Sequence, residues 1–308
     1  MRSSTYRLAA ALAAAMLLAM AASHAQALEP ISDADTSTIE KITGMKGKLS
    51  KEENVFKVTR PRTDVKVTVD RMLLPPFMGL APWAGFTPAL GGQLMMMGDM
   101  VVFEDEVNPV MSAALNAGLE VTALHNHFFF DQPKVYFMHV GGMGTAEKLA
   151  TGVRKVQDTI AAIRKTHPQP VQQFDGTIPS SNSISAAPLE SVLGQKGEVS
   201  NGMFKVTIGR PATMHGTKVG KEMGVNTWAG FTGTNDQAVV DGDFAVLPAE
   251  LQPVLKSMRS VNINIVSIHQ HMTAEEPRYL FLHYWGKGKA RELALGVKKA
   301  LDAQAAAH

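Results

Sequence analysis

The chain contains one pattern of residues twice, and this duplication restricts its possible folds more than any other feature. Residues 83–87 have the sequence Trp-Ala-Gly-Phe-Thr, and residues 228–232 repeat those letters. The offset between matching positions changes only from 150 near the start of the pattern to 144 near its end, so few insertions or deletions separate the copies. A period of this length exceeds that of a solenoid unit and is typical of a duplicated domain.

Composition divides the chain into four segments. Residues 1–27 predict a signal peptide, residues 35–165 a first repeat domain, residues 166–188 a linker and residues 189–305 a second repeat domain. The linker is rich in Pro, Ser, Gln and Asn, which favour an extended connection. The mature chain is long enough for two domains, and we expect each domain to have its own core.

Local patterns within a repeat predict an α+β fold in which an antiparallel sheet packs against helices. Short stretches of alternating polar and apolar residues favour strands, and longer stretches with apolar residues at helical spacing favour helices. In the first repeat the expected strands are 55–59, 65–69, 93–103, 119–127 and 134–140, and the expected helices are 37–43, 104–116 and 145–165.

The first residues have the features of a secretory leader. Arg2 and Arg7 precede an apolar run, and small residues at Ala25 and Ala27 offer cleavage sites. The apolar run is shorter than a membrane span, and no later segment has the length that a bilayer requires. We therefore expect an exported protein, periplasmic or secreted, with no membrane anchor after cleavage.

Composition also excludes several classes of function. The chain has no cysteine, which excludes disulfides, thiolate nucleophiles and Cys-ligated metals. Loss of Arg2 and Arg7 with the leader leaves 28 basic residues against 28 acidic residues, so the mature chain has no net charge to attract nucleic acid. The sequence favours a small ligand or a metal ion as the partner and does not specify the oligomeric state.

A histidine motif occurs at the same place in both repeats. It consists of His-x-His, an acid four residues later, a proline two residues after the acid and a final histidine after another six residues. The candidate metal ligands are His125, His127, Asp131 and His139 in the first repeat, and His269, His271, Glu275 and His283 in the second repeat.

We expect each motif to fold as a hairpin that collects its histidines on one face of the sheet. A turn centred on Gln132 places His125 directly opposite His139, and the same register places His269 opposite His283. The middle histidine of each motif shares this face because side chains alternate along a strand. The neighbouring positions on this face are apolar, so the imidazoles are predicted to line a core edge or a pocket floor beside the acid of the turn.

Clustered imidazoles beside a carboxylate are ligands that zinc and non-haem iron accept. A divalent-metal site in each repeat is therefore the leading hypothesis, with zinc or iron favoured over copper. The alternatives are a buried network of hydrogen-bonded histidines and proton-transfer chemistry. The spacing also partly matches the first cupin motif, but Met138 and Leu282 replace the glycine that the cupin pattern requires.

Two other repeated features have functional and structural interpretations. Trp83 and Trp228 are candidates for a ligand-binding surface, although a tryptophan beside glycine also suits a loop with a core anchor. Gly98-Asp99 and Gly242-Asp243 are expected to be turn residues. The chain has no Walker, dinucleotide-binding, G-x-S-x-G or H-E-x-x-H fingerprint.

Several of these segments resemble the LppY/LpqO-like family of exported bacterial proteins, which contain two copies of a domain of unknown function. The similar segments are residues 104–110, 120–127 and 133–139, with residues 275–278 and 283–285 in the second repeat. The chain departs from some members because it lacks a lipid-attachment cysteine, and Gln270 replaces the asparagine found at Asn126 in the first repeat. The resemblance implies export and a tandem architecture, and it implies no activity.

The sequence thus predicts an exported binding or sensing protein with a His/carboxylate site in each repeat. A metal-dependent hydrolase or lyase is the first alternative, so the question of enzymatic activity stays open. A structural or partner-binding module with buried histidine networks is the second alternative.

Overall fold

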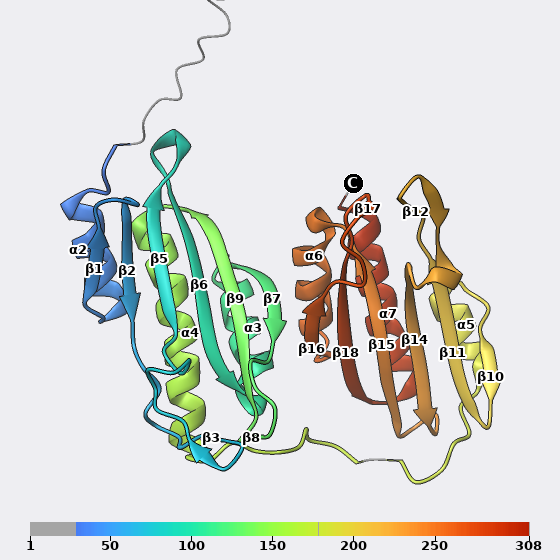
Figure 1. The fold of residues 1–308 in the computed structure, drawn as a ribbon. Coiled ribbons are helices and arrows are strands. Elements are labelled where there is room, and N and C mark those ends of the chain that lie inside the picture. The colour runs from blue at the N-terminus through green and yellow to red at the C-terminus, as the bar shows by residue number, and fades with distance from the viewer. Residues whose placement is uncertain (1–28, 178, 308) are drawn as a thin grey trace, which may run out of the picture.

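The computed structural model describes residues 29–177 and 179–307, so the predicted signal peptide lies outside the described residues. Twelve strands form one continuous antiparallel sheet in the order β1-β2-β5-β6-β9-β7-β16-β18-β15-β14-β11-β10 (Figure 1). The first six strands in this order come from the first repeat and the last six from the second. The α+β class and the two-repeat architecture predicted from the sequence are confirmed.

The described strands and α-helices follow the same order in both repeats, and the two 3-10 turns lie at different places. The strands of the first repeat are β1 Gly47–Ser50, β2 Val55–Thr59, β3 Thr68–Val69, β4 Met72–Leu73, β5 Trp83–Pro88, β6 Leu94–Phe103, β7 Glu120–His125, β8 Asp131–Gln132 and β9 Val135–Gly144. The strands of the second repeat are β10 Glu198–Ser200, β11 Met203–Gly209, β12 Ala212–Met214, β13 Thr217–Val219, β14 Asn226–Gly233, β15 Ala238–Val246, β16 Asn264–His269, β17 Glu275–Glu276 and β18 Leu280–Gly288. The helices are α2 Asp33–Thr43, α3 Glu104–Asn116, α4 Ala146–Thr166, α5 Ala186–Leu193, α6 Pro248–Arg259 and α7 Ala290–Ala305, and the 3-10 turns are η1 Leu90–Gly92 and η2 Lys221–Met223.

Helix ends coincide with capping residues in the sequence. The hydroxyl of Ser32 accepts a hydrogen bond from the Asp35 amide at the start of α2, and α2 ends at Gly44 in the left-handed region, with φ 66°. The predicted cap Thr145 is confirmed, because its hydroxyl accepts a hydrogen bond from the Lys148 amide at the start of α4. None of the helices in the described residues combines the length and apolar character needed to cross a membrane.

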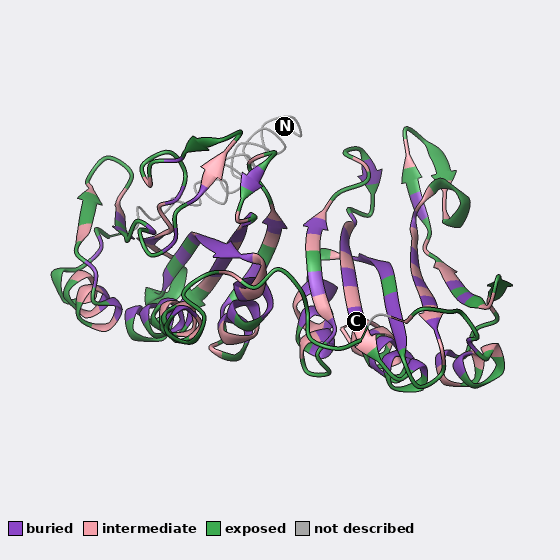
Figure 2. Ribbon diagram, turned by 90° about the horizontal axis from the view of Figure 1, so that it is seen from below, coloured by how far each residue is buried: buried purple, intermediate pink, exposed green. Residues whose placement is uncertain are grey.

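The six α-helices of the described residues lie on one face of the sheet (Figure 2). The two repeats meet where β7 pairs with β16, at Leu124 and Ile268, and both of these side chains are buried on the helix side. Core residues from both repeats form one contiguous cluster through this seam. The expectation of a separate core for each repeat is therefore wrong, because the sheet and its helix layer continue from one repeat into the other.

Two side-chain amides tie the repeats together at the seam. Asn108 of α3 donates to the carbonyl of Ile265 on β16 and accepts from the Ile265 amide, at 3.2 and 2.8 Å. Gln252 of α6 makes the reciprocal pair with the carbonyl and amide of Val121 on β7, at 2.8 and 3.0 Å. Both strands contain a register shift just after the residue that is held in this way. The amides thus satisfy backbone groups at the points where the strand ladder is irregular.

Two small sheets cover part of the face opposite the helices. One has the order β4-β3-β8 and the other has the order β13-β12-β17. Each small sheet encloses its own cluster of buried apolar residues, which includes Phe137 in the first repeat and Phe281 in the second. The strand predicted at 65–69 is mostly wrong, because only Thr68 and Val69 form a strand and they belong to the small sheet.

Candidate functional site

The histidines of both motifs lie on the face of the large sheet opposite the helices. His125 is the last residue of β7 and His139 lies on β9, and in the second repeat His269 is the last residue of β16 and His283 lies on β18. Their neighbour Leu124 points to the other face, into the core beneath the helices. Because β7 and β16 are adjacent strands, the two histidine clusters lie next to each other across the seam.

The predicted register of the hairpins is wrong by two residues. His125 pairs with Phe137 rather than with His139, and the second repeat shows the same shift. A shift of two residues keeps every side chain on its original face, so the expected contacts still form. Nε2 of His125 lies 3.1 Å from Nε2 of His139, and the rings of His269 and His283 stack with their centroids 4.7 Å apart.

The acids of the two motifs hold the turns instead of facing the histidines. Asp131 accepts a hydrogen bond from the Val135 amide at 2.7 Å, and Glu275 accepts one from the Tyr279 amide at 3.1 Å. Both carboxylates are buried, and neither belongs to the group of potential ligand atoms that the described residues bring within 4.8 Å of one another. The geometry therefore does not support Asp131 and Glu275 as metal ligands.

Two other acids, Asp99 and Asp243, lie beside the histidines, where Asp131 and Glu275 were predicted to lie. Asp99 on β6 pairs with His139, and Asp243 on β15 pairs with His283. The prediction that Gly98-Asp99 and Gly242-Asp243 form turns is wrong, because both pairs lie in the middle of long strands. Glycine is required there for packing: a Cβ on Gly242 would lie 2.4 Å from the carbonyl oxygen of Trp228 on the adjacent strand.

The second repeat holds a compact set of ligand atoms. One ligand atom each from Asp243, His269 and His271 lies within 4.8 Å of the other two, and Nε2 of His271 is 3.1 Å from Oδ2 of Asp243. Tetrahedral zinc with ligand bonds of about 2.0–2.1 Å separates its ligand atoms by about 3.3 Å, so small side-chain movements would suffice to coordinate an ion. The other oxygen of Asp243, Oδ1, is buried and has no hydrogen-bond partner.

Backbone carbonyls fix the orientation of two imidazoles in this repeat. Nδ1 of His271 lies 3.2 Å from the carbonyl oxygen of Gly224, and Nδ1 of His283 lies 3.2 Å from that of Gly242. A carbonyl only accepts, so each Nδ1 donates its N–H, and a ring in its neutral form then presents a lone pair at Nε2. The lone pair of His271 then faces a carboxylate oxygen of Asp243. Two acceptors at this distance call for a proton or a cation between them.

The first repeat has the same residue types in a looser arrangement. Asp99 is only partly buried, its Oδ1 lacks a partner, and His125 and His139 contact each other directly through their Nε2 atoms. The ring of His127 stacks on Phe137 with a centroid distance of 3.3 Å. In the described part of the chain, the three-residue group of the second repeat has no counterpart here. The two copies of the motif are therefore not equivalent.

Burial sets the protonation of these groups. Burial and then the nearby His283 and His271 lower the pKa of His269 to about 4, and burial also lowers the pKa of His127. Burial raises the pKa of Asp243, against the opposing effect of His283 and His271. Neutral imidazole is the form that binds a metal, so His269 remains available as a ligand well below neutral pH.

The two tryptophans flank the candidate sites. Trp83 pairs with Asp99 and Trp228 pairs with Asp243, so each lies one strand beyond a carboxylate on the histidine face. A lysine ammonium covers each ring, with Lys57 at 4.1 Å and Lys205 at 4.2 Å from the ring centroid. This position is compatible with a role in ligand binding, and it is not the loop that the neighbouring glycine suggested.

Sequence comparison places the chain in a family. Residues 37–159 and 187–303 each match the model described as Domain of Unknown Function (DUF1259). The chain belongs to this family. The two DUF1259 matches contain all of the histidines and acids discussed above.

Comparisons with characterised proteins add little. No curated protein is significantly similar to the chain. Among solved structures, a trimeric bacterial microcompartment shell protein, PduB, aligns over 83% of this chain and 89% of its own, with 7% identity and a TM-score of 0.21. That similarity is too low to support a statement about fold or function.

Proposed function

We propose that this DUF1259 protein is an exported metal-binding protein that binds a divalent ion in its second repeat through Asp243, His269 and His271. One observation carries the proposal: Nε2 of His271 lies 3.1 Å from a carboxylate oxygen of Asp243, while its Nδ1 lies 3.2 Å from the carbonyl oxygen of Gly224. Histidines that bind metals are commonly oriented in this way by a carbonyl or carboxylate.

The ligand set favours zinc or iron. Two histidines and one carboxylate form catalytic zinc sites and the facial triad of non-haem iron proteins. His283 lies against His269 and is available as a fourth ligand after a rotation of its ring. Methionine and cysteine, which copper(I) prefers, are absent from this three-residue group.

Export is the second part of the proposal. It is supported by the leader-like pattern in the first residues and by the resemblance to the LppY/LpqO-like family of exported bacterial proteins. Binding or sensing of the ion is the role that we propose first, because the ligand set by itself suffices for it.

A metal-dependent hydrolase or lyase is the second candidate, and one observation favours it. An open depression of about 570 Å³ adjoins the site and is lined by Asp241, His283, Trp285, Lys287 and Phe174 of the linker. Three protein ligands leave a coordination position for water or a substrate, and this depression offers room for the substrate.

Metal titration of protein purified without a histidine tag tests the proposal. After chelation, isothermal titration with Zn²⁺, Mn²⁺, Cu²⁺ and anaerobic Fe²⁺ should show one tight site per chain. His271→Ala and Asp243→Asn should weaken binding by about 100-fold or more, since the loss of a ligand costs at least as much as the loss of an outer-shell partner.

The first repeat provides the matched control. His127→Ala removes the equivalent histidine, and tight binding should persist in this variant. Absence of bound metal together with absence of any thermal shift would contradict the proposal and favour a structural histidine network. Equal losses in the His127 and His271 variants would contradict the assignment of the site to the second repeat.

A further inference from the structure

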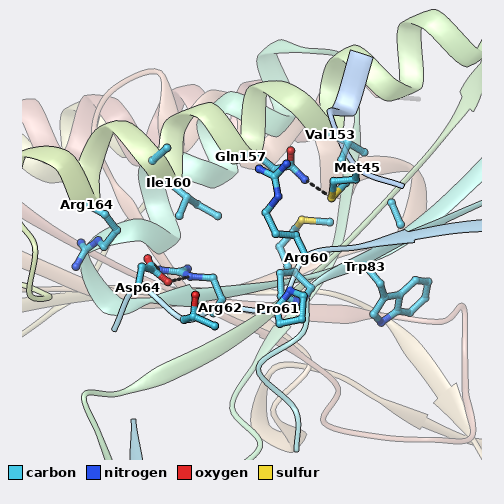
Figure 3. Close-up of a pocket in the computed structure, with 15 residues that line it drawn as sticks. Met45, Arg60, Pro61, Arg62, Asp64, Trp83, Val153, Gln157, Ile160 and Arg164 are labelled. Carbon is cyan, nitrogen blue, oxygen red and sulfur yellow. Dashed lines mark hydrogen bonds and ion pairs between the residues drawn. The ribbon is translucent and has the colours of Figure 1, made fainter. Parts of the chain in front are cut away.

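A second cavity lies in the first repeat, on the opposite face of the sheet. Figure 3 shows it between helix α4 and the segment that follows β2. Its volume is about 290 Å³, at the lower end of the range of small-molecule sites. Because α4 covers the helix side of the sheet, the cavity is separated from the histidines by the sheet itself.

The walls of the cavity are apolar. Its floor consists of Ala84, Met100 and Val153, which belong to the buried core. Met45 and Ile160 line the sides (Figure 3). A molecule in this cavity would therefore bury an apolar body against the core, which is a favourable contribution to binding.

Two polar groups on the wall lack partners. Oε1 of Gln157 is buried without a hydrogen bond, while its amide nitrogen contacts only the thioether sulfur of Met45, at 3.0 Å. Arg164 is 8% exposed; its Nη2 pairs with Asp105, its Nε lies 2.9 Å from Glu106, and its Nη1 is buried with no partner. Buried donors and acceptors without partners are costly, so the described residues alone do not satisfy the polar groups of this wall.

The charge at the mouth of the cavity is positive. Arg62 is neutralised by Asp64 and Glu106, but Arg60 has no ion pair among the described residues. Its Nη2 donates to the carbonyl of Gly44 at 3.0 Å, and Figure 3 shows its side chain extending from the lower wall towards α4. A guanidinium with free N–H groups beside an apolar slot is suited to a carboxylate.

The second repeat has different residues at the corresponding positions. With the offset of 144, Phe244 replaces Met100, Leu301 replaces Gln157 and Gln304 replaces Ile160. Phe244 is fully buried and Leu301 packs against the core, so both replacements are the ordinary residues of a closed interior. Gln304 donates to Glu250 at 2.7 Å and thereby occupies space against the ion pair of that repeat. A polar Gln157 with an unpaired oxygen, in place of a packed leucine, is thus peculiar to the repeat that keeps the cavity.

We propose that this cavity binds a small monocarboxylate with an apolar body, such as a medium-chain fatty acid. The chain would lie along Met100, Val153 and Ile160, and the carboxylate would accept hydrogen bonds from the guanidinium of Arg60 at the mouth. This site is independent of the proposed metal function, since the sheet lies between them.

Isothermal titration with octanoate, using 1-octanol as the matched neutral probe, tests the proposal. One octanoate should bind per chain, and 1-octanol should bind about tenfold or more weakly because it lacks the charge-assisted hydrogen bonds. The Arg60→Gln variant should lose the same factor for octanoate and none for 1-octanol. Arg60 is exposed, so this variant should keep its fold.

Variants that fill the cavity form the second part of the test. Met100→Phe, which introduces the larger residue of the second repeat, and Ala161→Leu at the rim should each abolish octanoate binding. Ala305→Leu is the matched control, because Ala305 is the equivalent of Ala161 in α7 and is exposed. Circular dichroism melting verifies that each variant is folded.

The supporting and contradicting results of these experiments differ. Loss of binding in the filling variants with retention in Ala305→Leu supports the cavity as the site, and chelation of metal should leave octanoate affinity unchanged. The proposal is overturned if octanoate gives no saturable binding, if 1-octanol binds as tightly as octanoate, or if the filling variants bind like the original chain.

Discussion

Asn108 should contribute more to stability than an ordinary polar side chain, because it holds the seam between the repeats. Its side chain is 4% exposed, and its two hydrogen bonds satisfy the backbone of Ile265, which is 1% exposed. In Asn108→Ala both backbone groups lose their partner in a place that water reaches poorly. Each unsatisfied buried group costs about 1–3 kcal/mol, so we expect the two groups together to lower the free energy of unfolding by about 2–6 kcal/mol.

Gln252, which makes the equivalent pair of hydrogen bonds across the seam, provides a comparison for this estimate. Gln252 is only partly buried, so water can replace it, and Gln252→Ala should cost about 1–2 kcal/mol. Urea unfolding followed by tryptophan fluorescence measures both values, and a second transition would appear if the weakened repeats unfold separately. Asn116→Ala on the exposed end of α3 is the control, with an expected change within about 0.5 kcal/mol. The reasoning fails if Asn108→Ala is as mild as this control.

Two further predictions concern the candidate site. The pKa of His269 is about 4 in the fold and about 6.5 in an unfolded chain, so the unfolded state binds more protons between these values. The stability of the metal-free protein should therefore rise as pH increases from 4 to 6.5, and His269→Gln should reduce that slope in urea titrations; an unchanged slope would exclude His269 as its source. A Cβ in Gly242→Ala would lie 2.2 Å from the ring of Tyr284, so we expect a loss of about 3 kcal/mol or more together with weakened metal binding at Asp243. Gly98→Ala meets its nearest atom at 2.7 Å and should be milder, and thermal unfolding of the two variants compares them directly.

Much of the fold follows from local sequence. The helix α3 and the strand β2 have the bounds expected from their capping and alternation patterns. The hairpin register was wrong because residues 126–134 do not form a tight turn. They extend away from the large sheet so that β8 can pair with β3, and a pairing between residues 62 and 64 positions apart has no local signal. The observed register differs from the predicted one by two residues, an even number, so the histidine side chains lie on the predicted face of the sheet.

The carboxylate of the site was missed for a different reason. Gly-Asp is a common turn dipeptide, and Gly98 and Gly242 suggested turns. Only the packed sheet shows that these glycines permit a close approach of the neighbouring strand. One signal was present: a single charged residue within the apolar strand 93–103 recurs at the same place in the second repeat. A charged residue at the same place inside a predicted strand in both copies indicates a functional position, whatever the turn propensity of the neighbouring glycine.

The pairing of β7 with β16 has a consequence for any chain that carries only one repeat. Such a chain would leave one of these strands as a bare edge, with its N–H and C=O groups unpaired beside a histidine cluster. The seam is nearly two-fold symmetric, so two single-repeat molecules could close the edge by pairing with each other. Joining both copies in one chain removes this dependence on concentration. It also allows the two copies to diverge in sequence, so that one copy can keep a compact ligand set while the other keeps a cavity.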